Sequence, residues 1–143
     1  MCGSSDACAG DDLNRHNYFV FDFTGVDLSA SSVELRLFQP ASPDGFLSQY
    51  PSLAYSLFDV SFDPTNPFND QLALYTDLGS GISFGSVVVD SSTNGTTVVI
   101  SFNAAGVSAV NDSADAYFYV GGAVVPEPET YAMLLAGLGL LGF

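Results

Sequence analysis

Apolar and polar side chains alternate with a period of two along most of the chain. In residues 17–24 (NYFVFDFT) three phenylalanines fall on one face, while Tyr18, Val20 and Asp22 fall on the other. The same pattern recurs in five further stretches, residues 33–38, 53–62, 82–89, 96–102 and 116–120. Because successive side chains of a β-strand point to opposite faces, this pattern predicts six short strands, each with one buried face.

The Asn94-Gly95 pair predicts a β-hairpin. It lies between the strands expected at 82–89 and 96–102, and both residue types tolerate positive φ. We therefore expect these two strands to be neighbours in one sheet.

Two segments lack the alternation and favour helix. Residues 69–78 are a weak candidate, and residues 103–110 are a better one because Asn103 is a suitable N-cap. Both are short, so the strands dominate the expected fold.

The six strands and the turns between them, rich in Gly, Pro, Asn and Asp, predict an all-β fold, an antiparallel β-sandwich that is jelly-roll-like. A length of 143 residues fits one folded domain. We divide the chain into a flexible N-terminal segment at 1–16, a sandwich ectodomain at 17–123 and a C-terminal segment at 124–143 that ends in a short apolar helix.

The C-terminal segment has its own composition. Every residue in the range 131–143 is apolar or glycine, and Val125-Pro126-Glu127-Pro128-Glu129-Thr130 stands directly before it. Thirteen helical residues reach about 20 Å, which is less than the ~30 Å hydrocarbon core of a bilayer. The two prolines predict an extended, solvated stub over 125–130, which a processing peptidase could bind as a strand.

The run VPEPETYAMLLAGLGLLGF resembles the PEP-CTERM sorting signal. This resemblance implies export by a Gram-negative bacterium that makes exopolysaccharide, with an exosortase, a membrane-embedded cysteine protease, as partner. It implies recognition of Val125, Pro126, Glu127, Pro128 and Thr130. It also implies transient contact with the inner membrane through Tyr131, Leu134, Leu135, Leu138, Leu140, Leu141 and Phe143. The destination would be the cell surface or the extracellular matrix.

The resemblance has two departures. The arginine-rich tail that ends the family's signal does not follow Phe143, and residues 1–16 show no apolar export signal. We expect from this that the sequence is a fragment or a truncated gene model. If it is complete, the expectation is an unsorted relic of the family.

The body of the chain carries a second resemblance. Residues 17–122 are similar to the ectodomains of a group of PEP-CTERM proteins, and residues 17–60 are similar to carbohydrate-module-like sandwiches of bacterial surface proteins. The chain passes from Gly121-Gly122-Ala123 directly into the Pro-Glu-Pro stub. We therefore expect one edge strand to be missing, which would leave a sheet edge unpaired.

Charge excludes whole classes of partner. Lys and Arg number 2 against 16 Asp and Glu, which gives a formal net charge of −14. Nucleic-acid binding needs clustered cations that neutralise phosphate, and docking on anionic lipid needs a basic patch. Neither partner is expected.

Catalytic side chains are scarce. The sequence has one histidine, His16, and lacks a G-x-S-x-G nucleophile elbow. None of the acidic residues lies in a context that predicts the raised pKa of a glycosidic acid. We therefore expect no catalytic residues and a non-enzymatic protein.

A carbohydrate-binding module, calcium-dependent or built on an aromatic platform, is the alternative function. Calcium could bind the oxygen-rich loop through Asp63, Asn66, Asn69 and Asp70, although the same side chains are suited to turns that they form with their own backbone. Sugar-stacking candidates are Tyr18, Tyr50, Tyr55, Tyr117 and Tyr119, of which the last two share a strand face and are expected to pack.

The two cysteines, Cys2 and Cys8, leave two possibilities open. They could close a short disulfide loop if the protein is exported, or stay as two thiols in a frayed terminus. Their number and spacing do not match a zinc site.

Overall fold

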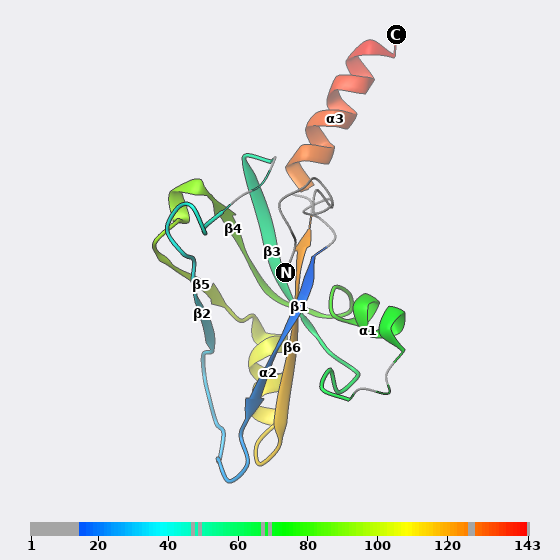
Figure 1. Cartoon of the computed structure of the whole chain (residues 1–143). Helices are drawn as coiled ribbons and strands as arrows, with labels where there is room; N and C mark the ends of the chain where they lie inside the picture. Colours follow the sequence, from blue (N-terminus) through cyan, green and yellow to red (C-terminus); the bar gives the residue numbers. More distant parts are fainter. Residues whose placement is uncertain are drawn as a thin grey trace.

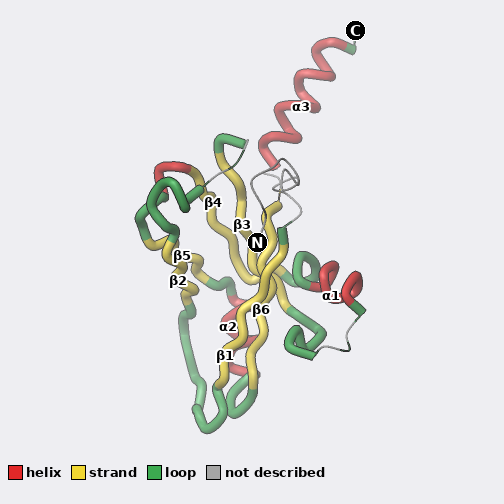
Figure 2. Tube along the Cα trace, in the orientation of Figure 1, coloured by secondary structure: helices red, strands yellow, loops and turns green. Residues whose placement is uncertain are grey.

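Two antiparallel sheets form the body of the protein, as seen in a computed structural model that describes residues 15–46, 48, 50–66, 68, 70–125 and 128–142. One sheet has four strands in the order β1-β6-β3-β4, and the other pairs β2 with β5 (Figures 1 and 2). The strands are β1 (His16–Asp22), β2 (Glu34–Phe38), β3 (Ser52–Asp59), β4 (Ser83–Asp90), β5 (Thr97–Ser101) and β6 (Tyr117–Val125). The predicted all-β sandwich is confirmed.

Strand β6 lies in the middle of the larger sheet. It pairs antiparallel with β1 on one side and with β3 on the other. The sequence predicted that this strand ends at Val120, but the ladder continues through Gly121 and Gly122 to Val125. The glycine pair therefore belongs to a strand that has neighbours on both sides, and the expected missing edge strand stays a prediction.

The connection around Asn94-Gly95 is not a hairpin. Strand β4 pairs with β3 and β5 pairs with β2, so the chain crosses here from one sheet to the other. A short 3₁₀ helix, η2 (Ser91–Thr93), starts the crossing. Gly95 has the positive φ of +74° that the sequence suggested, but Asn94 has a φ of −60°. The predicted turn at Asn94-Gly95 is present, but the prediction that it closes a hairpin is wrong, because the turn joins strands of different sheets.

Aromatic rings fill the space between the sheets. The side chains of Leu57, Ile100 and Val120 are fully buried at its centre. Around Phe118 the rings of Phe21, Phe23, Phe84 and Phe102 lie within 6.4 Å, centroid to centroid. The predicted inner row of phenylalanines on β1 is confirmed, because Phe19, Phe21 and Phe23 pack against this core.

Two helices close the body at different places. Helix α2 (Ala104–Asp112) begins at the predicted cap, where the Asn103 side chain accepts a hydrogen bond of 3.0 Å from the Gly106 N–H. Helix α1 (Gln71–Asp77) is capped by Asp70, which accepts from the amides of its first turn. In Figure 1, α2 lies beside the lower half of the sandwich and α1 lies to the other side of β6.

Helix α1 is attached to the outer face of the four-stranded sheet. His16 at the start of β1 stacks on Tyr75 with ring centroids 4.0 Å apart, and its Nδ1 lies 2.5 Å from the Tyr75 carbonyl oxygen. Gly121 lies directly beneath the backbone of Leu78, the C-cap of α1. The connection between β3 and β4 therefore covers part of that face.

Candidate functional site

The C-terminal segment emerges directly from the sheet. Val124 is in register with Tyr55 on β3, and Val125 is in register with Ala54. On the other side the Val124 N–H donates to the Arg15 carbonyl oxygen at 3.4 Å. The first residues of the segment are thus held by strand pairing, with no free linker between the folded body and Val125.

Helix α3 (Pro128–Leu141) projects away from the sandwich (Figure 1). Leu140 and Leu141 are 83% and 84% exposed, and Met133, Leu135 and Leu138 are also exposed. A methyl group added at Gly137 or Gly139 would meet nothing within 4 Å. The described leucine and methionine side chains of this apolar helix lie outside the core and expose a surface suited to a nonpolar environment.

The predicted extended stub is shorter than expected. We expected residues 125–130 to be extended, but Pro128 and Thr130 lie in α3. Proline is well suited to the first helical position, because its missing N–H is one that has no helical partner there. Pro126, Glu127 and Phe143 lie outside the described residues, as do the side chains of Val125, Pro128, Thr130, Tyr131 and Leu134.

The length of α3 agrees with the prediction of an apolar helix shorter than the bilayer core. Its 14 residues give a rise of roughly 21 Å, less than a bilayer's hydrocarbon core. Among the described helices none is long and apolar enough to cross a membrane.

A folded sandwich followed at once by an exposed apolar helix defines a protein with a C-terminal signal separate from its core. A family model for the PEP-CTERM protein-sorting motif matches residues 124–143. The chain therefore carries a PEP-CTERM sorting signal, and this signal indicates an exported protein that is processed by an exosortase, a membrane enzyme. Neither the curated proteins nor the solved structures contain a match to this chain.

The oxygen-rich loop uses its side chains locally. Asp63 Oδ1 accepts from the Thr65 amide at 2.9 Å and from its hydroxyl at 2.6 Å. Asn66 Oδ1 accepts from the Phe68 amide, and Asp70 caps α1. Asn69 lies outside the described residues. These are the turn contacts that the sequence offered as the alternative to a calcium site.

The remaining polar candidates are His16, Cys2 and Cys8. His16 is engaged with Tyr75, as described above, and Cys2 and Cys8 lie outside the described residues. Within the part of the chain that the structure describes, no three His, Cys, Asp or Glu side chains come together as a metal-binding group would require.

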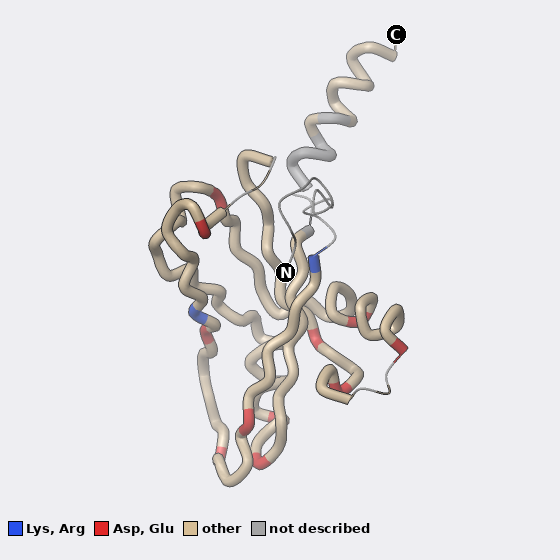
Figure 3. The backbone as a smooth tube through the Cα atoms, in the orientation of Figure 1, with Lys and Arg blue, Asp and Glu red and all other residues tan. Residues whose placement is uncertain are grey.

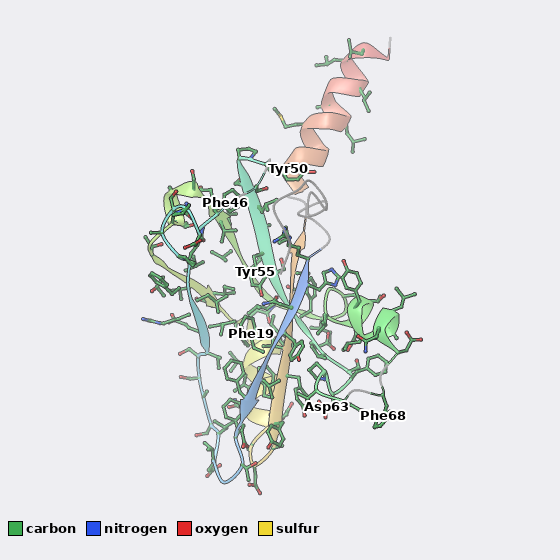
Figure 4. The ribbon with its side chains drawn as sticks, viewed as in Figure 1. Phe19, Phe46, Tyr50, Tyr55, Asp63 and Phe68 are labelled. Carbon is green, nitrogen blue, oxygen red and sulfur yellow. The ribbon has the colours of Figure 1, made fainter. Side chains whose placement is uncertain are left out.

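The candidate tyrosines separate into different environments. The Tyr55 hydroxyl donates to Asn17 Oδ1 at 2.7 Å, and burial raises the pKa of Tyr55. Figure 4 shows Tyr55 on the central part of β3, whereas Tyr50 precedes the strand. Tyr18 is 43% exposed on β1. No common binding face unites these three.

Tyr117 and Tyr119 form a separate pair. Their rings are nearly parallel, at 11°, with centroids 6.3 Å apart, so the expected packing of one ring near the other is present. Sequence reasoning missed that each ring adjoins a carboxylate, Asp22 or Asp63. The sequence shows the two similar turns, Asp22-Phe23-Thr24 and Asp63-Pro64-Thr65, but not that each lies near a tyrosine.

Proposed function

We propose that this protein is a non-enzymatic, exported protein that acts at the bacterial cell surface or in the exopolysaccharide matrix after exosortase processing. The observation that carries the proposal is the match of the sorting motif to residues 124–143, in whose helix the described leucine and methionine side chains are exposed. A Gram-negative exopolysaccharide producer is the host that the motif suggests.

The non-enzymatic part of the proposal is supported by how the candidate groups are used. His16, the one histidine in the sequence, stacks on Tyr75 and interacts with its carbonyl oxygen, which fixes the orientation of the imidazole. A general base needs a nucleophile or substrate proton within hydrogen-bond reach. Its observed partners give His16 a role in attaching α1 to the sheet.

The sorting role is tested by replacing Pro126, Glu127 and Pro128 with alanine in a host that contains an exosortase. We expect loss of processing, seen as retention of the larger species on a gel and in the membrane fraction. The matched control replaces the same residue types on the exposed surface of the sandwich, at Glu34, Pro40 and Pro51. Normal processing of the motif variant would refute recognition of the Pro-Glu-Pro sequence.

The calcium-dependent alternative is tested by a thermal melt with and without millimolar Ca²⁺. A ligand of the native state raises the melting temperature by mass action. Because Asp63, Asn66 and Asp70 are engaged with local amides, we expect no change in melting temperature. A rise that is abolished in D63N would instead favour the calcium-binding module.

A further inference from the structure

Two neighbouring tyrosines, one exposed and one half-buried, lie on the outer face of the β1–β6 ladder. Tyr117 is 53% exposed and Tyr119 is half-buried, and their rings run nearly parallel. Across the ladder Asp22 is in register with Tyr117, and Val20 with Tyr119. We call Tyr117, Tyr119, Asp22 and Asp63 the tyrosine–aspartate strip.

Each carboxylate of the strip is held by the same kind of local turn. In the turn at 22–24 the Thr24 amide donates to Asp22 at 2.9 Å, and in the turn at 63–65 the Thr65 amide donates to Asp63 at 2.9 Å. Asp22 is paired with Tyr117 in the β1–β6 register, and Asp63 lies near enough to Tyr119 to act on it electrostatically. Two segments far apart in the sequence thus fix two parallel rings next to two anchored carboxylates.

The strip carries negative charge. Hydrogen bonds from Thr24 and Thr65, ahead of all other causes, lower the pKa of the Asp22 and Asp63 carboxyls below 3.8, so both are ionised at neutral pH. Of the two arginines, Arg15 precedes the opposite end of β1, and Arg36 lies on β2 in the other sheet, paired with Glu34 (Figure 3). With a net charge of −14, the protein repels anions and attracts cations at this face.

This combination of groups selects for a particular ligand chemistry. Aromatic faces attract a cation through the ring quadrupole, and ionised carboxylates strengthen that attraction and accept hydrogen bonds. Tyrosine rings also pack against C–H surfaces. A ligand that fits all three features is cationic, rich in hydroxyl donors and lined with C–H groups.

We propose that the tyrosine–aspartate strip binds an amine-bearing polysaccharide, a polymer of glucosamine units with protonated nitrogens. Ammonium groups contact the carboxylates and ring faces, and sugar hydroxyls donate to the exposed Asp22 carboxylate. The choice of a polysaccharide over another polycation rests on the matrix association proposed above, to which the strip gives a contact surface. A basic peptide shares the charge but lacks the array of hydroxyl donors.

The test measures binding of the purified full chain by calorimetry in mildly acidic buffer. The probes are a glucosamine hexamer, the corresponding N-acetylglucosamine hexamer and hexalysine. We expect the glucosamine hexamer to bind at least about tenfold more tightly than its acetylated counterpart, because acetylation removes the charge. Hexalysine is expected to bind more weakly than the glucosamine hexamer.

Variants locate the binding on the strip. Y117A/Y119A should weaken binding of the glucosamine hexamer about five- to thirtyfold, the loss expected for two exposed cation–π contacts. D22N/D63N should weaken it more than D44N/D112N, which removes the same charge from exposed positions elsewhere. Far-ultraviolet circular dichroism confirms that each variant is folded.

Any of three results would overturn the proposal. They are no binding of the glucosamine hexamer to the wild-type chain, unchanged affinity in Y117A/Y119A, or hexalysine binding as tight as the sugar. If a variant does not fold, NMR of the wild-type chain decides, because the hexamer must shift the ring signals of Tyr117 and Tyr119. The assay needs no exosortase, so its failure is distinct from a failure of the sorting experiment.

Discussion

Gly121 offers a direct test of how α1 is attached to the sheet. A Cβ at this position would lie 2.5 Å from the Leu78 carbonyl oxygen, 2.9 Å from its Cα and 3.0 Å from its carbonyl carbon. Ordinary contacts between such atoms are about 3.5 Å, so in G121A the end of α1 must move outward by roughly 1 Å. Strand β6 cannot yield instead, because β1 and β3 hold it on both sides.

Two opposing effects determine how much G121A changes the free energy of unfolding. Overpacking of this kind costs about 1–3 kcal/mol. Replacing glycine by alanine also stabilises the folded protein by about 0.4–1 kcal/mol, because alanine restricts the conformations of the unfolded chain. The net loss is about 1–2 kcal/mol, and for a domain of roughly 110 residues each kcal/mol lowers the melting temperature by about 4 °C. We therefore expect G121A to melt about 4–8 °C below the wild-type protein.

Circular dichroism melts of the two proteins measure this difference. The matched control is G137A, because a Cβ at Gly137 meets nothing within 4 Å and lies in a helix outside the core. Hydrogen exchange adds a local readout, since amides of residues 71–78 should lose protection in G121A. An unchanged or raised melting temperature in G121A would show that α1 is not seated on β6 as described.

Two further predictions concern the core and a turn. L57A should lower the free energy of unfolding by about 2–5 kcal/mol, because Leu57 is fully buried, whereas L140A, at a site 83% exposed, should leave a urea melt unchanged. D90N should destabilise the chain at neutral pH, because Asp90 caps η2 and hydrogen bonds, first from Ser92, lower its pKa below 3.8. A carboxyl with a lowered folded-state pKa stabilises the fold above its unfolded pKa and loses this effect as pH falls through the folded value. The difference between D90N and the wild type should therefore shrink as pH falls below 3.8, and a difference that stays constant there would contradict this origin.

The sequence predicted those features that depend on neighbouring residues. The inner phenylalanines of β1 follow from strand periodicity, and the start of α2 follows from the side chain of Asn103. Pairing between distant strands is not a local property, so the position of β6 between β1 and β3 could not be read from its own residues. For the same reason the turn at Asn94-Gly95 was assigned to a hairpin although it joins two sheets.

Of the candidate sites, one could be predicted from neighbouring residues and the other could not. The sorting motif is a linear sequence, so Val125 to Thr130 could be recognised without any structure. The tyrosine–aspartate strip requires the β1–β6 register and the return of the 63–65 turn to the same face. Each Asp-x-Thr turn is visible in the sequence, but only the fold places each of them beside a tyrosine.

The pairing of Val124 and Val125 leads to a final prediction about processing. A peptidase that binds its substrate as an extended strand must compete with β3 and β1 for the backbone of these residues. With net contributions of about 1 kcal/mol per hydrogen bond, opening two or three of them costs about 2–3 kcal/mol, which leaves the open form at about 1%. Inserting six Gly/Ser residues between Val124 and Val125 separates the intact Val125–Thr130 motif from the sheet, so processing should accelerate about tenfold or more. The same insertion between Gly25 and Val26, in the exposed loop after β1, is the control. An unchanged rate in the first variant would mean that the sheet does not restrain the signal, and that the peptidase reads only residues beyond the strand.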